Sequence, residues 1–189
     1  MAKQDYTACG AIQNEFQQNA CYRSIAISKN DANICGKIQN AGMKDGCYSS
    51  IVISSQDPAL CDAIQTQGVR DDCYLYGARV KHSIDLCPKI KGQSAKDLCY
   101  SVEMPGKQLA ACDEIHNATL KDKCYREVGI GNQNADVCLK ITAQDVKDTC
   151  LSAVGVLRQD QKICDMITTP DIKKTCQKGV NVETSGRQE

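Results

Sequence analysis

The chain has 189 residues, and its 23 basic and 23 acidic side chains give a formal net charge of zero. That balance provides no long-range field to attract nucleic acid or an anionic membrane. Trp is absent, Phe occurs once and aromatic residues make up only 4% of the chain, so the large anchors of a conventional hydrophobic core are missing.

Cysteine organises the sequence. Fourteen cysteines recur at alternating separations of 12 and 14 residues, except for one separation of 13 just before Cys112. A unit of about 26 residues is therefore repeated seven times, and a period of this size is typical of a repeat array. We expect one repeat domain over residues 5–180 and a frayed polar tail over 181–189. The expected units are 5–30, 31–56, 57–82, 83–107, 108–133, 134–159 and 160–180.

Each unit is predicted to begin with a short helix of about two turns. Four residues before the first cysteine stands a residue whose side-chain oxygen can cap the first turn in six of the seven units. An isoleucine three residues after the cysteine and an apolar residue just before it form one buried face. The expected cap positions are Asp5, Asp31, Asp57, Ser83, Gln108, Asn134 and Asp160, of which Gln108 is the exception.

A second helix of about three turns is predicted to follow, with the second cysteine in its buried stripe. Seven residues before that cysteine, five units carry a strong N-cap, namely Asn14, Asn40, Thr66, Asn117 and Thr169. Each unit is thus a helical hairpin. Because so short a hairpin cannot bury its apolar face alone, neighbours must stack. The predicted fold is all-α, a right-handed-type α-solenoid of seven hairpins, each closed by one disulfide.

The spacing of the cysteines distinguishes between several possible roles. Zinc sites need cysteines two to four residues apart, whereas no two cysteines here are closer than 12 residues. Thioredoxin-type redox chemistry needs Cys-x-x-Cys, which is absent. A copper-storage bundle carries its thiolates in pairs one helical turn apart, while this chain has one cysteine per predicted helix. Structural disulfides are favoured over these uses and over apolar filling.

Two pairings are conceivable, within a unit or between neighbouring units. The separation within a unit is 12 in all seven copies, whereas the separation between units slips once from 14 to 13. A covalent bridge across a tight turn tolerates no change in length, so within-unit pairing is predicted. The expected disulfides are Cys9–Cys21, Cys35–Cys47, Cys61–Cys73, Cys87–Cys99, Cys112–Cys124, Cys138–Cys150 and Cys164–Cys176.

Disulfides at this density predict an extracellular, cell-surface or periplasmic location. The start, MAKQDYTACG, lacks the apolar stretch of a signal peptide, so an exported protein with this sequence would be a mature or trimmed form. No apolar run approaches the roughly 18–20 residues of a spanning helix, and no membrane span is expected.

Two further patterns follow the repeat. A tyrosine comes directly after the second cysteine in five units, and a basic–acidic pair comes just before it. The tyrosines could pack between hairpins with their hydroxyls at the rim, or could form a ligand-binding stripe. The charged pairs could form a network between repeats or a recognition surface. The possible interaction ladder consists of Tyr22, Tyr48, Tyr74, Tyr100 and Tyr125.

The fourth unit is irregular. Pro88 follows Cys87, and Asp85 is predicted to act as a late N-cap that places Pro88 in the first helical turn. Pro105, within Met104–Gly106, is expected to end the second helix early. With the one-residue deletion, these features predict a change in solenoid curvature between the fourth and fifth hairpins. Asn117–Thr119 matches a glycosylation sequon, but Asn117 is also a predicted N-cap.

The pattern D-x-x-x-C-x-x-I…[KR]-D-x-C-Y resembles the cysteine-rich, disulfide-stapled helical-hairpin repeats of exported proteins from archaea and little-studied bacteria. The resemblance covers nearly the whole chain and implies a secreted stapled solenoid with no defined activity. No catalytic constellation or cofactor site is visible. We therefore expect a non-enzymatic scaffold, more often monomer than polymer, that binds a protein or glycan. A structural subunit of a surface layer or filament is the first alternative, and copper storage is the second.

Overall fold

The computed structural model describes residues 6–101 and 109–182. Every regular element within these ranges is a helix. The chain divides into two compact units, Met1–Cys99 and Tyr100–Glu189, and each unit is described by itself.

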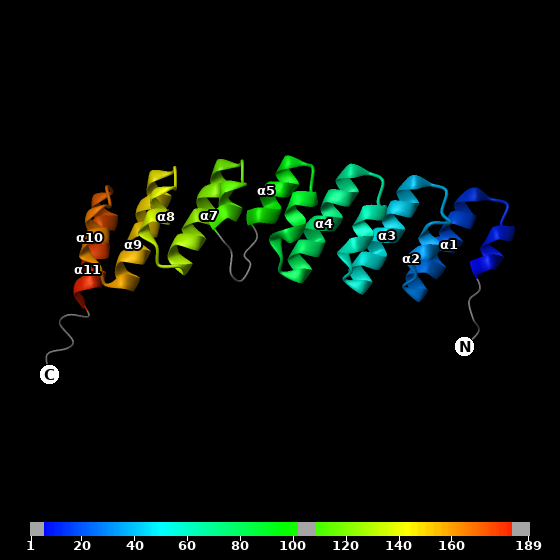
Figure 1. Ribbon diagram of the computed structural model, residues 1–189, viewed down its shortest axis with the longest axis horizontal. Helices are drawn as coiled ribbons and strands as arrows, with labels where there is room; N and C mark the ends of the chain where they lie inside the picture. Colours follow the sequence, from blue (N-terminus) through cyan, green and yellow to red (C-terminus); the bar gives the residue numbers. More distant parts are fainter. Residues whose placement is uncertain (1–5, 102–108, 183–189) are drawn as a thin grey trace, which may run out of the picture. The chain divides into compact units, whose positions relative to one another are not determined.

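In the first unit, a short helix and a long helix alternate. The long helices α1, α3 and α4 lie side by side, and each short helix packs against the long helices next to it (Figure 1). The elements are η1 (Tyr6–Ala11), α1 (Glu15–Lys29), α2 (Ala32–Cys35), α3 (Ala41–Ser55), η2 (Pro58–Ala63), α4 (Gln67–Lys81), η3 (Ile84–Lys89) and α5 (Gln93–Ser101), whose last two residues belong to the second unit.

The second unit repeats the same alternation. Helix α9 packs against both α7 and α11, with short helices between them in the chain. The elements are α6 (Leu109–Asp113), α7 (Ala118–Gly131), α8 (Ala135–Leu139), α9 (Gln144–Arg158), α10 (Gln161–Asp165) and α11 (Pro170–Val182). Residues 181 and 182 extend α11, which corrects the expectation that the frayed tail begins at 181; residues 183–189 lie outside the described residues.

The predicted repeat of helical hairpins is confirmed, but the helix lengths differ from expectation. Helix α2 has only 4 residues, and η1, η2 and η3 are 3₁₀-helices of 6 residues. The chain turns away early because the isoleucine N–H bonds back to the first cysteine, as Ile38 N does to Cys35 O at 3.1 Å. The long helices instead gain about one turn, since α1, α3, α4 and α9 each have 15 residues.

Most predicted N-caps are confirmed. In five short helices the expected side chain accepts from the N–H two residues on: Asp31, Asp57, Ser83, Asn134 and Asp160. Asn14, Asn40 and Asn117 cap long helices, each accepting from the N–H three residues on. The other two expected caps of the short helices, Asp5 and Gln108, lie outside the described residues.

The threonines depart from the prediction. Thr66 precedes α4 but makes no side-chain cap bond. The Thr169 hydroxyl instead donates to the Asp148 carboxylate at 2.6 Å. A threonine at this position therefore stabilises the contact with the preceding hairpin, because its hydroxyl reaches the nearest buried negative charge.

The expected rescue of Pro88 by Asp85 is wrong. Ser83 keeps the N-cap role, accepting from Asp85 N at 3.1 Å, and Pro88 lies inside the 3₁₀-helix η3. Two other hairpins adopt the same 3₁₀ form without an internal proline, so Pro88 occupies a conformation that the repeat already uses. The expected early stop at Met104–Gly106 lies outside the described residues, as does part of the segment that would set the curvature there.

Non-glycine residues in the left-handed region end the long helices. Their φ values lie between 49° and 55°. In four of these turns the next N–H bonds to the carbonyl five residues back, as Asp160 N does to Gly155 O at 3.0 Å, which completes a Schellman turn. The residues are Asn30, Gln56, His82, Gln133 and Gln159. Glycine is the usual residue in this conformation, so the sequence alone did not reveal these turns.

The within-unit disulfide pairing is confirmed. All seven bridges join cysteines 12 residues apart with Cα–Cα distances of 5.5 to 5.7 Å. The last two bridges also pack on the preceding long helix. A Cβ atom at Gly155 would lie 2.9 Å from Cys176 Sγ and 3.1 Å from Cys164 Sγ, and one at Gly129 would lie 3.1 Å from both Cys138 Sγ and Cys150 Sγ. Glycine at these two positions therefore gives the bridge the space it occupies.

Full reduction should abolish most of the helical signal, because short helices of four to six residues are unstable without a tether. Each bridge closes a loop of about 13 residues, for which chain entropy predicts roughly 3 kcal/mol. Circular dichroism with excess reductant and chelator measures this effect. Helicity and a melting midpoint that match the oxidised protein would show that the bridges are dispensable.

Candidate functional site

A buried carboxylate connects successive hairpins. It belongs to the aspartate two residues before the second cysteine, and the exposed fraction of these side chains is 5% or less. In the first hairpin the position is occupied by Asn19, which is 1% exposed. The aspartates are Asp45, Asp71, Asp97, Asp122 and Asp148.

The carboxylate bonds to the turn of the next hairpin. Asp45 Oδ1 accepts from Gln65 N at 2.8 Å, and its Oδ2 accepts from Thr66 N at 2.9 Å. These two N–H groups immediately precede helix α4, so the carboxylate also lies near the positive end of that helix. Asp71, Asp122 and Asp148 repeat both bonds to their own next hairpins.

These contacts change the acidity of the aspartates. Burial by itself raises the pKa of Asp148, but the hydrogen bonds from Thr169 and Thr168 outweigh it and lower the pKa to about 2. The same opposition lowers the pKa of Asp45, Asp71 and Asp122. The carboxylates are therefore ionised at neutral pH and act as structural anions.

The basic member of the charged pair works within its own hairpin. Lys121 Nζ donates to Asp113 O at 3.1 Å, and Arg70 Nη1 donates to Ile64 O at 3.0 Å. Both carbonyls lie at or just beyond the C-terminal end of a short helix, where a cation is favoured. In these two hairpins the basic residue caps the short helix, and the buried acidic members of the pairs are not available as a recognition surface.

The predicted tyrosine ladder lies partly inside the fold. Tyr74, Tyr100 and Tyr125 are buried, whereas Tyr22 and Tyr48 are half-buried. Tyr125 Oη donates to Asp113 Oδ1 at 2.6 Å, and Tyr74 Oη donates to Asp62 in the same way.

A lysine from the next hairpin covers each of these two rings. Lys89 Nζ lies 5.1 Å from the Tyr74 ring centre, and Lys140 Nζ lies 5.8 Å from that of Tyr125. Tyr74 and Tyr125 thus pack between hairpins, and a ligand-binding role for the ladder stays a prediction.

The seventh hairpin lacks both connecting groups. Lys174 stands where the other hairpins carry the buried Asp or Asn, and Gln177 replaces the tyrosine. Gln177 Nε2 still donates to Asp165 Oδ1 within the hairpin, at 3.2 Å. Because a lysine cannot accept two backbone N–H bonds, this hairpin cannot bind a further one in the same manner.

On four of the long helices, the residue six positions after the second cysteine is aliphatic and at least partly exposed, whereas α4 carries Arg79 there. Ile53 is 57% exposed and Ile27 is 37% exposed in the first unit. Ile130 and Val156 hold the position in the second unit and are half-buried. We call these four residues the aliphatic stripe. Sequence reasoning missed it, although the spacing of the four residues was visible.

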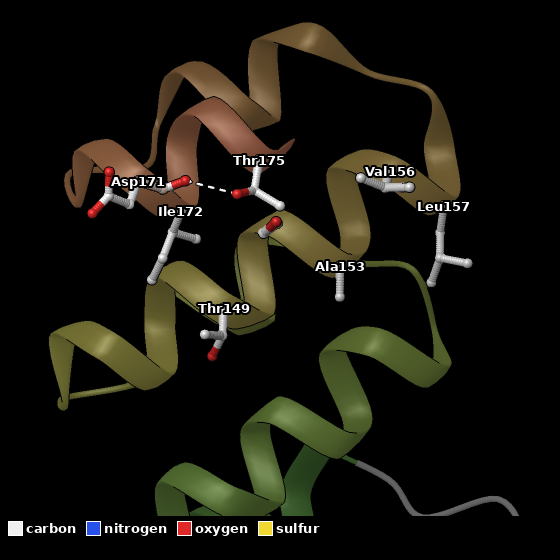
Figure 2. A pocket seen from close by; sticks show the side chains of 8 residues that line it. Thr149, Ala153, Val156, Leu157, Asp171, Ile172 and Thr175 are labelled. Atoms are coloured by element: carbon white, nitrogen blue, oxygen red, sulfur yellow. Dashed lines mark hydrogen bonds between the residues drawn. The ribbon is translucent and has the colours of Figure 1, made fainter. Parts of the chain in front are cut away.

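A groove accompanies the stripe between α9 and α11. It has a volume of about 710 Å³ and is lined by Ala153, Val156, Leu157 and Ile172 together with serine, threonine and aspartate side chains (Figure 2). Leu157 is 54% exposed. Mixed lining of this type suits a partner that offers both apolar groups and hydrogen bonds.

The cysteines leave no thiolate for copper, because all fourteen are in disulfides. Over residues 6–101 and 109–182, histidine, cysteine and acidic side chains form no group able to hold a metal ion. Within the same ranges, none of the helices combines the length and hydropathy needed to cross a bilayer. Asn117 caps α7 through Oδ1, which accepts from Leu120 N at 3.0 Å, and its glycosylation stays a prediction.

Comparison with protein family models, curated proteins and solved structures finds no match to this chain. The seven intrachain disulfides indicate an oxidising, extracytoplasmic environment. Further statements about function rest on the geometry described above.

Replacing Asp71 by Ala should lower the free energy of unfolding by about 3 kcal/mol, because two backbone donors lose a charged acceptor. Asp72→Ala is the matched control: Asp72 is the next residue along the helix and is exposed, so its loss should cost less than about 0.5 kcal/mol. Urea unfolding at pH 7 measures both.

Urea unfolding at acidic pH tests whether the negative charge of Asp71 provides this stabilisation. The folded-state pKa of Asp71 lies below its ordinary value, so the stabilisation is complete above about pH 4 and is lost as the pH falls through the lowered pKa. The stability difference between wild type and Asp71→Ala should therefore shrink in acid. Equal effects of the two substitutions, or a difference that does not depend on pH, would contradict the proposed role of the carboxylate.

Proposed function

We propose that this protein is an extracytoplasmic, non-enzymatic repeat scaffold that binds a protein or glycan partner. The observation that carries the proposal is the aliphatic stripe, which recurs at a fixed position in the repeat while remaining accessible. Ile53 and Ile27 are more than one third exposed, although α3 buries its Ile51 and Val52 almost completely. A recurrent exposed apolar position suits an interaction surface.

The contacts inside the array involve other residues than those of the aliphatic stripe. The cysteines form disulfides, and aspartates such as Asp45 and tyrosines such as Tyr125 are hydrogen-bonded within or between hairpins. The outer face of the long helices takes no part in these bonds, so it can vary without weakening the array. An extended face on a stack of rigid repeats is the usual binding surface of such proteins.

The runner-up, a subunit of a surface layer or filament, receives less support. End-to-end growth by the repeat's own interface would require a carboxylate at the position of Lys174. The cell surface, the periplasm and the extracellular space all fit the disulfides, and we propose one of these as the location.

A photoreactive crosslinker tests the proposal. Placed at Ile53 or Leu157, it should give a discrete adduct when the oxidised protein is incubated with an extract of the source cell's surface. Asp136, an exposed residue of a short helix, is the control position and should give none. Equal labelling from all three positions, or adducts with a second copy only, would contradict the scaffold proposal.

A further inference from the structure

The interface between the first two hairpins differs from the others in one atom. In the contacts of Asp45, Asp71, Asp122 and Asp148, both carboxylate oxygens accept N–H bonds from two successive residues, as those of Asp45 do from Gln65 and Thr66. Asn19 occupies the equivalent position in the first hairpin, and its Oδ1 accepts from Gln39 N at 2.8 Å. The second branch of this side chain is an amide Nδ2, a donor, whereas the aspartates offer a second acceptor oxygen to the following N–H, which here belongs to Asn40.

Two donors thus meet without an acceptor. Asn19 is 1% exposed, and among the described residues its Nδ2 has no hydrogen-bond partner. The backbone N–H of Asn40 has none either within the same part of the chain. Because Asn19 and Asn40 line the same cavity and Asn40 is exposed, an oxygen atom of a ligand can accept from these donors.

The two donors open into a cavity between the N-terminal ends of α1 and α3. Its volume is about 310 Å³, near the lower end of the range of roughly 300–1,000 Å³ for ligand pockets. Beside Asn19 and Asn40 it is lined by Asn14, Glu15, Phe16 and Met43. Phe16, the chain's single phenylalanine, is 71% exposed.

The lining restricts the chemistry of the occupant. Glu15 brings a carboxylate and no lysine or arginine lines the cavity, so an anionic ligand is disfavoured. A hydroxyl group can both accept from the two donors and donate to Glu15. The apolar face of a ring can lie against Phe16 and Met43. A neutral, polyhydroxylated ring meets all of these requirements.

We propose that the cavity between the N-terminal ends of α1 and α3 is a saccharide-binding site. One sugar hydroxyl accepts from Asn19 Nδ2 and the Asn40 N–H, a second donates to Glu15, and the ring packs on Phe16. This inference rests on the proposed function, in which the partner is a protein or a glycan, and it specifies where a glycan binds. The site lies at the opposite end of the long helices from the aliphatic stripe, so each proposal can fail without the other.

Two substitutions test the site. Asn19→Asp supplies the missing acceptor oxygen and recreates the contact of the later hairpins, so it should stabilise the fold and weaken sugar binding at least tenfold. Phe16→Ala removes an exposed ring and should weaken binding to a similar extent without changing the melting midpoint. Leu157→Ala, in the groove between α9 and α11 of the second unit, is the control and should bind sugar as the wild type does.

Saturation-transfer NMR on the full oxidised chain provides the measurement, with glucose, galactose, mannose and N-acetylglucosamine as probes. Acetate and inorganic phosphate serve as anionic probes. At least one sugar should bind the wild type, and the two substitutions should remove most of its signal. The proposal is overturned if no tested sugar binds, if sugar binding survives both substitutions, or if only acetate or phosphate competes for the site.

Discussion

A bond between two sulfur atoms holds each short helix against the long helix that follows it. Without that bond, an element as short as Ala32–Cys35 has too few hydrogen bonds to persist. With it, the turn between the two helices is fixed, and its two backbone N–H groups point in a defined direction. The buried carboxylate of the preceding hairpin can bind them only because the bridge has already placed them there.

The two interactions therefore have complementary roles. The disulfide sets the geometry within a hairpin, and the aspartate carries that geometry to the next hairpin through bonds such as Asp122 Oδ2 to Ala143 N at 2.9 Å. The bridge also contributes to stacking, because it packs on a small residue such as Gly155 of the preceding helix. Few large side chains are needed, which accounts for the scarcity of aromatic residues.

Because stability comes from repeated bonds at fixed positions, the remaining surface is open to other uses. The aliphatic stripe and the cavity beside Asn19 illustrate two ways in which this occurs. The stripe adds exposed apolar groups at a position that no bond between hairpins requires. The cavity arises where one member of a repeated contact, an asparagine in place of an aspartate, leaves the contact incomplete.

The sequence by itself determined the number of hairpins, the disulfide pairing and most of the helix caps. Each of these depends on residues close together in the chain, such as Cys138 and Cys150 at a constant separation of 12. The caps also follow local rules, as the confirmed roles of Asp31 and Asn40 show.

Only the tertiary structure decided what the recurring aspartate does. Its acceptor bonds reach residues 20 and 21 positions later, across a hairpin boundary, so no local pattern distinguishes a buried connector from a surface charge. For the same reason the hydroxyl of Thr169 turned from its expected cap toward Asp148. The unpaired donors at Asn19 likewise became visible only once Gln39 and Asn40 were placed beside it, because an unmade hydrogen bond has no signature in a sequence.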